Sequence, residues 1–227
     1  MQSQVLADAQ TLATAAAVLI AADARAAVAA RGRYVFAVSG GSTPWVMLRA
    51  LAAQDVPWHA VHVLQVDERV APAGDPLRNL TPLRASLLAP AQFHAMPVEA
   101  PDLAAAAGRY AQLLCELTGS PAVLDLVHLG LGPDGHTASL VPGDPVLDVT
   151  DLDVALTTGT YQGTRRMTLT YPALARARRV LWLVSGAEKA AMLVRLQAHD
   201  RSIPAGRVRA DHALVLADHA AAPPAAP

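Results

Sequence analysis

Short apolar runs alternate along the chain with longer stretches of helical pattern. Continuous apolar runs bounded by turn residues are typical of strands that are buried on both faces of a parallel sheet. Parallel neighbours need long crossover connections, which the helices between the runs supply. The pattern therefore predicts an α/β fold with a mainly parallel sheet and helices on both faces. The expected strands are residues 34–38, 61–66, 93–97, 125–131, 154–158, 166–170, 180–184 and 213–217.

The helices between these runs have recognisable start signals. Thr43-Pro44 and Thr81-Pro82 each place a hydroxyl before a proline, which predicts a capping residue followed by the first helical residue. Asp102 is expected to cap a third helix. The expected helices are residues 44–53, 81–89, 101–118, 171–178 and 187–199.

The apolar segment 12–24 has the length of a signal-peptide core but not its surroundings. No Lys or Arg precedes it, and Asp8 stands where a basic region is expected. Asp23 and Arg25 interrupt the run before it is long enough to span a membrane. We therefore interpret residues 3–30 as an alanine-rich helix and expect a cytoplasmic protein.

The composition is that of a globular chain, because 53% of its 227 residues are hydrophobic and 16% are charged. We expect one domain over residues 1–219 and a low-complexity tail over 220–227. The net charge of −1 gives no electrostatic reason to expect a nucleic acid or a membrane as partner. Cys115 is the single cysteine, which excludes an internal disulfide, and no histidine has metal-ligand spacing, so we expect no metal site.

Residues 130–143, GLGPDGHTASLVPG, contain the G-x-G-x-x-G pattern of dinucleotide-binding folds in Gly130, Gly132 and Gly135. That pattern needs a strand before it and a long helix after it. The strand is predicted, but Pro142 follows so soon that little more than one helical turn fits before it. We therefore expect no nucleotide cofactor.

His136 lies directly after this glycine pattern, on an irregular loop at the end of the predicted strand 125–131. Imidazole titrates near neutral pH, which suits general acid or base catalysis. We therefore interpret the segment as a catalytic loop. Ser39, Ser42 and Ser139 would suit a serine hydrolase, but none lies in the G-x-S-x-G pattern of such enzymes.

A second glycine-containing loop follows the predicted strand 34–38. Ligands of open α/β sheets bind beyond the carboxyl ends of the strands. Here Gly40 and Gly41 allow a tight turn, and Ser42 and Thr43 offer amides and hydroxyls to an anion at the start of a helix. An ordinary turn with a helix cap has the same composition, so both interpretations stay open.

Charged residues gather at further strand ends. Asp67, Glu68 and Arg69 directly follow the run 61–66, where a solvated turn is the alternative interpretation. Lys189 falls in the first turn of a predicted helix, where the helix dipole disfavours a cation unless an anion is near. Further cationic candidates are Arg165 and Arg166. Together these residues predict a site for a phosphorylated small molecule with acid/base chemistry.

Five segments together resemble the 6-phosphogluconolactonases of the glucosamine-6-phosphate isomerase/6-phosphogluconolactonase family. In the family's order they are SGGSTP at 39–44, VDERV at 66–70, LGLGPDGHTASLVPG at 129–143, RRMTLTYPAL at 165–174 and SGAEKAAML at 185–193. The resemblance implies hydrolysis of 6-phospho-D-glucono-1,5-lactone in the oxidative pentose phosphate pathway, without a cofactor. It also implies the three-layer, Rossmann-like fold of glucosamine-6-phosphate deaminase. The expected partner is the sugar-phosphate lactone, and the expected assembly is a monomer or small homo-oligomer.

Glucosamine-6-phosphate deaminase is the close alternative, because it resembles the chain at the glycine loop, the Asp-Glu pair, GPDGH and the lysine. The deaminases typically carry Asp-Glu-Tyr and GPDGHIAFNEP, where this chain has Arg69 after Asp-Glu and has GPDGHTASLVP. Both differences favour the lactonase. A second alternative is a non-catalytic sugar-phosphate sensor on the same fold. Sensing does not require a base, so the presence of His136 together with Asp67 argues against it.

The resemblance suggests a role for each candidate residue. His136 would take a proton from the water that attacks the lactone carbonyl, and Arg69 would stabilise the oxyanion. Asp67 would orient either His136 or Arg69. The residues expected to hold the phosphate are Gly40, Gly41, Ser42, Thr43, Lys189 and one of Arg165 and Arg166.

Overall fold

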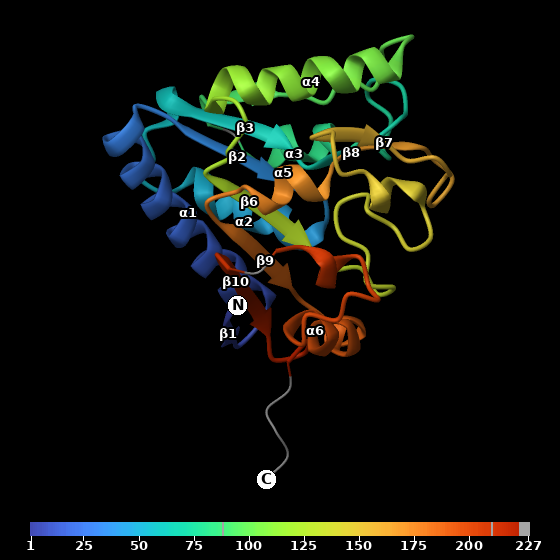
Figure 1. Ribbon diagram of the computed structural model, residues 1–227. Coiled ribbons are helices and arrows are strands. Elements are labelled where there is room, and N and C mark those ends of the chain that lie inside the picture. Colours follow the sequence, from blue (N-terminus) through green and yellow to red (C-terminus); the bar gives the residue numbers. More distant parts are fainter. Residues whose placement is uncertain (88, 210, 223–227) are drawn as a thin grey trace.

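Seven parallel strands form the central sheet, in the order β1-β10-β9-β6-β2-β3-β5 (Figure 1). The computed structural model describes residues 1–87, 89–209 and 211–222, so residues 223–227 of the expected tail 220–227 lie outside the described residues. The sheet confirms the predicted α/β fold. Its strands span Gln2–Leu6 (β1), Tyr34–Val38 (β2), Val61–Gln65 (β3), Gln92–His94 (β5), Leu126–Gly130 (β6), Val180–Val184 (β9) and Ala213–Asp218 (β10).

Helices cover both faces of the sheet, as predicted. One layer contains α1, α2 and α3, and the other contains α4, α5 and α6 (Figure 1). The helices span Ala9–Arg31 (α1), Ser42–Ala52 (α2), Leu80–Ser86 (α3), Leu103–Thr118 (α4), Tyr171–Ala175 (α5) and Ala190–Gln197 (α6).

The central strand β2 explains why the apolar runs are continuous. Tyr34 and Phe36 pack with the α1 and α2 layer, whereas Val35 and Ala37 pack with the α4 layer. Successive side chains of a strand point to opposite faces, so a strand between two helical layers needs apolar residues at every position. No side chain of β2 is more than 2% exposed. Burying each large apolar side chain contributes about 1.5–3 kcal/mol.

The strand order places a crevice beside β2. From β2 the chain proceeds to β3 and β5 on one side, and β6 then pairs with β2 on the other side. The loops that follow two such neighbouring strands run in opposite directions, so they move apart at the carboxyl ends of the strands. Open α/β sheets bind their ligands in the crevice that this leaves. The loops that follow β2 and β6 are the predicted anion loop 39–44 and the predicted catalytic loop 130–143.

A second, antiparallel sheet of three strands lies beside this crevice, in the order β4-β8-β7. The amide of Val66 donates to Val38 of the main sheet, and the carbonyl of Val66 accepts from Leu169 of the small sheet. The chain therefore passes from one sheet to the other at this residue. The segment 67–69 is consequently a strand and not the solvated turn considered above. The strands span Asp67–Arg69 (β4), Val154–Leu156 (β7) and Arg166–Leu169 (β8).

The expected helix over residues 3–30 is wrong at its start. Gln2–Leu6 is an edge strand, and α1 begins after Asp8, whose carboxylate accepts from the amide of Thr11 at 2.7 Å. The side chains of β1 are mostly exposed, so this strand lacks the apolar run that marks the others. The helix ends at Gly32, which adopts the left-handed conformation with φ 76°.

By length and composition, α1 is apolar enough to cross a membrane. Its apolar side, however, packs in the core of this fold. Leu12, Ala16, Ile20 and Ala24 are at most 1% exposed and belong to one cluster with side chains of β2 and β3. The helix therefore forms one layer of the fold, which agrees with its interpretation as an alanine-rich helix.

Two of the three predicted helix caps are wrong. Gly41 and Asn79 occupy the N-cap positions of α2 and α3, so Thr43 and Thr81 lie inside the first turn. Neither helix start has a side-chain cap of its own. Asp102 caps α4 as predicted, because its carboxylate accepts from a first-turn amide at 3.0 Å.

Glu68 replaces the missing cap of α3. Its fully buried carboxylate accepts from the backbone amides of Asn79 at 2.7 Å and of Leu80 at 2.9 Å, and from the amide of Arg69 at 2.8 Å. The Nε of the equally buried Arg78 lies 3.2 Å away. Glu68 thus joins β4 to α3 and fixes the backbone on which the neighbouring charged residues stand.

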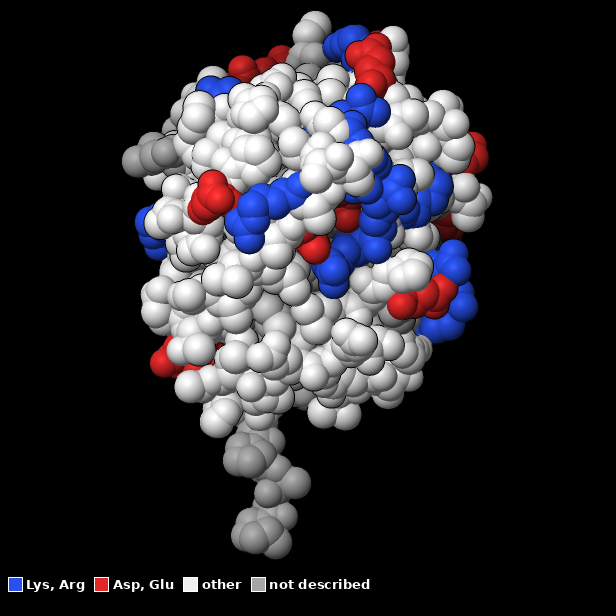
Figure 2. All heavy atoms as spheres, turned by 90° about the vertical axis from the view of Figure 1, so that its left-hand side faces the viewer, with Lys and Arg blue, Asp and Glu red and all other residues white. Residues whose placement is uncertain are grey.

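Ion pairs fasten α1 to the amino ends of the strands, at the opposite end of the sheet from the crevice. Asp125 pairs with Arg31 at 2.6 Å and with Arg178 at 3.5 Å, and Asp23 of α1 pairs with Arg179 at 2.6 Å. Figure 2 views the molecule from the left of Figure 1 and shows a band of basic side chains across that face, with acidic side chains beside it. The pairing gives arginines on this face a structural role.

We predict that Glu68→Gln lowers the free energy of unfolding by about 3–5 kcal/mol, because it leaves the Arg78 guanidinium without its buried counter-charge. The new amide would also place N–H groups against backbone donors. Denaturant unfolding of both proteins measures the difference. The matched control is Glu99→Gln, which removes the other partner of Arg78, a side chain that is 53% exposed. The control should cost under about 1 kcal/mol, and equal losses in the two variants would contradict the assignment.

Candidate active site

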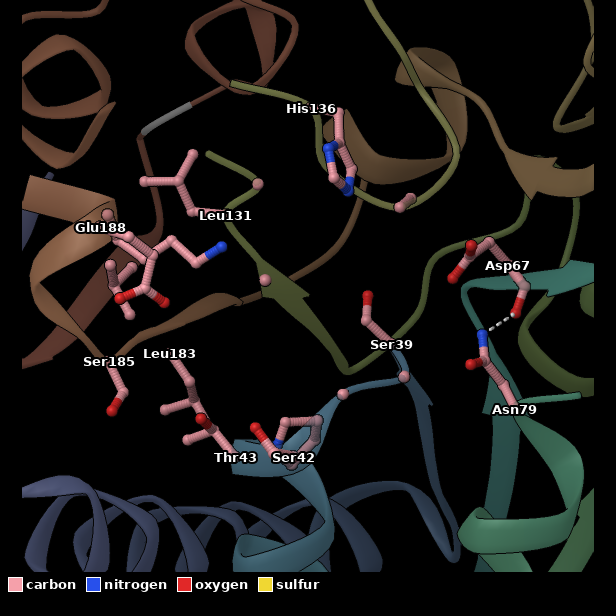
Figure 3. Close-up of a pocket in the computed structure, with 18 of the residues that line it drawn as sticks. Ser39, Ser42, Thr43, Asp67, Asn79, Leu131, His136, Leu183, Ser185 and Glu188 are labelled. Atoms are coloured by element: carbon pink, nitrogen blue, oxygen red, sulfur yellow. Dashed lines mark hydrogen bonds between the residues drawn. The ribbon is translucent and has the colours of Figure 1, made fainter. Parts of the chain in front are cut away.

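The crevice contains a pocket of about 300 Å³ beyond the carboxyl ends of β2, β6 and β9. Figure 3 shows His136 entering from one side, Ser42 and Thr43 across from it, and Asp67 with Asn79 at one end. Of the residues predicted from sequence, all except Arg165 line this pocket. They are Gly40, Gly41, Ser42, Thr43, Asp67, Arg69, His136, Arg166 and Lys189.

The loop after β2 requires both of its glycines. Gly41, the N-cap of α2, has φ 135°, which side chains rarely adopt. A Cβ on Gly40 would lie 2.0 Å from the side-chain oxygen of Asn79. Because no side chain caps α2, the first-turn amides beside Ser42 and Thr43 are open to an anion from the pocket.

The glycine pattern after β6 shapes the loop around His136. The amide of Gly132 donates to the carbonyl of His136 at 2.8 Å, and Gly135, with φ 82°, donates to the carbonyl of Gly132 at 3.0 Å. A Cβ on Gly132 would lie 2.0 Å from the imidazole Nδ1. A short turn, closed by a bridge between Thr137 and Leu140, follows in place of the long helix of a dinucleotide site. Gly132 therefore makes room for the imidazole, and Gly135 supplies the positive φ of the turn and the close approach to Ile203.

Asp134 is the hydrogen-bond partner of His136. The imidazole Nδ1 lies 2.5 Å from a carboxylate oxygen of Asp134, and the backbone amide of His136 donates to the same oxygen at 3.1 Å. Burial opposes ionisation, but the bonds from His136 lower the pKa of Asp134 below its ordinary value. An Asp134 carboxylate accepting from Nδ1–H leaves the lone pair of Nε2 free to take a proton.

Asp67 makes neither of the two contacts expected for it. Its carboxylate accepts from the hydroxyl of Ser139 at 2.6 Å and lies 4.0 Å from the guanidinium of Arg166. Burial raises the pKa of Asp67, and the bond from Ser139 and the charges of Arg69 and Arg166 oppose this rise. Among the hydrogen bonds of the described residues, none joins Asp67 to His136 or to the side chain of Arg69. Instead, Asp134 bonds the imidazole Nδ1, and the guanidinium of Arg69 donates to the carbonyl of Leu77 at 2.6 Å.

Arg69 and Arg166 face each other across the antiparallel pair β4 and β8. Arg166 is 3% exposed, and in the described part of the chain the Nε atoms of both guanidinium groups are buried without a hydrogen-bond partner. Buried donors without partners are costly, so they favour an acceptor from the pocket. Arg165, in contrast, donates through its Nε to the carbonyl of Thr157 at 3.3 Å.

Lys189 reaches the pocket from the turn between β9 and α6. It ends the 3₁₀ turn Ala187–Lys189, one residue before α6 begins, and not within the first helical turn as predicted. Gly186, with φ 101°, opens this turn, and its amide donates to the carboxylate of Asp218 at 3.2 Å. The same carboxylate accepts from the hydroxyl of Ser185 at 2.5 Å, which fixes the backbone that carries Lys189.

The sequence analysis missed a buried contact beneath the anion loop. The amide of Ser39 donates to Nδ1 of His128 at 3.3 Å, and the hydroxyl of Ser39 donates to the carbonyl of His128 at 3.1 Å. Burial lowers the pKa of His128 to about 3, so this imidazole stays neutral. The side chain of His128 lies in the sheet interior, and nothing in the sequence links it to the loop after the neighbouring strand β2.

No group of three or more His, Cys, Asp or Glu side chains is arranged to hold a metal ion in residues 1–87, 89–209 and 211–222. The pocket instead combines the imidazole of His136, the carboxylates of Asp67 and Glu188, and cations from three different elements. Such an arrangement suits binding of a phosphorylated compound and general base chemistry on it.

Comparison with known proteins adds independent findings. A sequence model of a family described as glucosamine-6-phosphate isomerases/6-phosphogluconolactonase matches residues 7–216. The 6-phosphogluconolactonase of Synechocystis sp. is 39% identical over 197 residues, which cover 83% of this chain and 81% of that protein. The structure is similar to that of a 6-phosphogluconolactonase from Shewanella baltica, with a TM-score of 0.85, 26% identity and coverage of 96% and 97% of the two chains.

A monomeric glucosamine-6-phosphate deaminase also has a similar structure, with a TM-score of 0.85 over 98% of this chain and 99% of that one. The sequence identity is 20%, so this similarity shows a shared fold. It confirms the three-layer, Rossmann-like architecture expected from the sequence.

We predict that Gly132→Ala breaks the bond between His136 and Asp134, because the added methyl occupies the position of the imidazole. NMR of the histidine side-chain nitrogens measures the change as altered Nδ1 and Nε2 shifts of His136. Gly130→Ala is the matched control, since a Cβ on Gly130 meets no atom within 4 Å. Its spectrum should match that of the wild type, and an unchanged spectrum in Gly132→Ala would refute the predicted clash.

Proposed function

This chain belongs to the glucosamine-6-phosphate isomerase/6-phosphogluconolactonase family, and from this premise we propose that its pocket hydrolyses 6-phospho-D-glucono-1,5-lactone to 6-phosphogluconate. The observation that carries the proposal is the pocket itself, which combines an imidazole held by Asp134 with cations from β4, β8 and the turn before α6. These are the groups that hydrolysis of a phosphorylated lactone requires.

The sequence relatives favour the lactonase over the deaminase. The relative from Synechocystis sp. is named a 6-phosphogluconolactonase at 39% identity, whereas the deaminase shares the fold at 20% identity. The alternative of a non-catalytic sensor is not favoured either, because a sensor needs no base with a free nitrogen. A cytoplasmic location and a monomer or small homo-oligomer stay predictions from the sequence.

The phosphate of the substrate binds at the anion loop. Ser42 and Thr43, at the uncapped start of α2, supply amides and hydroxyls, and Lys189 supplies a charge from the turn before α6. Of the two candidate arginines, Arg166 adds its charge, because Arg165 does not line the pocket. This orientation leaves the lactone ring near His136.

His136 acts as the general base. Its Nε2 takes a proton from a water molecule, which attacks the C1 carbonyl of the lactone, while Asp134 accepts from Nδ1–H and stabilises the imidazolium that forms. The negative charge that develops on the carbonyl oxygen is stabilised by Arg69. The C1–O bond of the ring then breaks, and the imidazolium returns its proton to the leaving ring oxygen. One water is consumed, and one acid and one alcohol are formed.

Asp67 has a positioning role in this scheme. Its carboxylate lies beside Arg166 and accepts from Ser139 of the catalytic loop, so it ties β4 to the loop that carries His136. Such positioning increases the rate of the reaction, because even a small displacement of a catalytic group lowers that rate strongly.

We predict that His136→Ala lowers kcat by about 10²–10⁴-fold, as expected for the loss of a general base. The assay follows hydrolysis of 6-phospho-D-glucono-1,5-lactone above its spontaneous rate. Product binding should be largely retained. Absence of turnover in the wild type would refute the proposed function, whereas normal turnover in the variant would refute the role of His136 alone.

Lys189→Ala should mainly raise KM, because a contact to the remote phosphate is similar in the ground state and the transition state. A charge-assisted hydrogen bond contributes about 1.5–3 kcal/mol, so kcat/KM should fall roughly 10–150-fold. The control substrate is unphosphorylated glucono-1,5-lactone, for which the defect should nearly vanish. Equal defects with both lactones would place Lys189 at the carbonyl instead.

A further inference from the structure

We propose that Tyr161 is a positioning residue that holds the base and a cation of the pocket in one arrangement. It lies outside the residues that line the pocket, on the connection between β7 and β8. The inference rests on the proposed function, because it assigns His136 as the base. Neither the sequence motifs nor the family resemblance singled out Tyr161.

The hydroxyl of Tyr161 completes the hydrogen bonding of Asp134. It donates to Oδ2 of Asp134 at 3.1 Å, while Oδ1 of the same carboxylate bonds to Nδ1 of His136. The hydroxyl also lies 3.3 Å from that Nδ1, and the two rings meet edge to face with centroids 5.1 Å apart. A carboxylate held at both oxygens has one orientation, and it therefore keeps the imidazole in the Nδ1–H tautomer.

The ring and backbone of Tyr161 hold Arg166. The guanidinium carbon of Arg166 lies 5.0 Å from the centroid of the Tyr161 ring, a cation–π distance, and Nη2 donates to the carbonyl of Tyr161 at 3.1 Å. Nη2 also lies 3.3 Å from the side-chain oxygen of Gln162. These contacts fix the guanidinium of Arg166, which is one of the residues that line the pocket.

A tight turn sets the position of Tyr161. Tyr161 and Thr164 form an antiparallel bridge, with bonds of 2.9 and 3.4 Å between their backbones. The two residues between them, Gln162 and Gly163, have φ 52° and 82°, as in hairpin turns of type I′. Such a turn restricts the backbone of Tyr161, and the contacts of the ring with His136 and Arg166 hold the side chain.

Tyr161 thus connects the proposed base to a proposed phosphate-binding cation. One phenol bonds the carboxylate that orients His136 and stacks on the guanidinium of Arg166. Loss of the hydroxyl should disturb the base alone, whereas loss of the ring should disturb both groups. This separation makes the proposal testable with two substitutions at one position.

The first test is Tyr161→Phe, which keeps the ring over Arg166 and removes the hydroxyl. NMR of the substrate-free protein should show part of His136 shifting from the Nδ1–H to the Nε2–H tautomer. In the lactone assay, kcat should fall about 10-fold with little change in KM, as expected for one lost hydrogen bond to a charged group. Tyr161→Leu should in addition raise KM for the phosphorylated lactone.

Tyr171→Phe is the matched control. Tyr171 also donates its hydroxyl, to the carbonyl of Pro204 at 2.9 Å, and its ring also lies against an arginine, Arg207 at 4.9 Å, but neither of these partners lines the pocket or lies in the catalytic loop. This variant should match the wild type in the His136 spectrum and in kcat. An unchanged spectrum in Tyr161→Phe would overturn the proposal, whatever its kcat. Because the spectrum is recorded without substrate, this outcome is distinct from a failure of lactone hydrolysis.

Discussion

Burial of the parallel sheet on both faces is the constraint on which the rest of the molecule depends. Helices cover both sides of β2, so its side chains are apolar and at most 2% exposed. Charged and catalytic groups are expensive to place in such an interior, and they collect instead beyond the carboxyl ends of the strands. The divergence of the chain on either side of β2 then opens the pocket where these groups meet.

The chain passes from the main sheet to the small antiparallel sheet at Val66, which places the small sheet beside the carboxyl ends of the main strands. Without it, Asp67 and Arg69 would continue β3 and could not face Arg166 of β8. The buried carboxylate of Glu68 holds this geometry, since it bonds the start of α3 and pairs with Arg78. Of the three charged residues of β4, Glu68 therefore stabilises the fold, whereas Asp67 and Arg69 line the pocket.

In the loop after β6, the position of the imidazole depends on residues that are close to it in the sequence. Glycines at 132 and 135 let the chain turn so tightly that Asp134 reaches the imidazole two residues later. Glu68 and Asp134 are neighbours of predicted site residues, yet their partners differ in kind. Glu68 bonds backbone amides of Asn79 and Leu80, eleven and twelve residues further along the chain. Asp134 bonds His136, two residues away in its own loop. Only the bond between Asp134 and His136 has a sequence spacing short enough for it to be inferred from the sequence.

By itself the sequence determined the α/β class, the positions of most strands, and nearly all of the residues that line the pocket, because these depend on apolar periodicity and on residues next to strand ends. It did not reveal β1, whose exposed side chains carry no apolar pattern, or the separate sheet that contains β4 and β8. Nor did it decide between Arg165 and Arg166 or identify the partner of Asp67. Those facts arise from hydrogen bonds between segments far apart in the chain, such as that between Ser139 and Asp67, which are set when the sheets pack and leave no local signature.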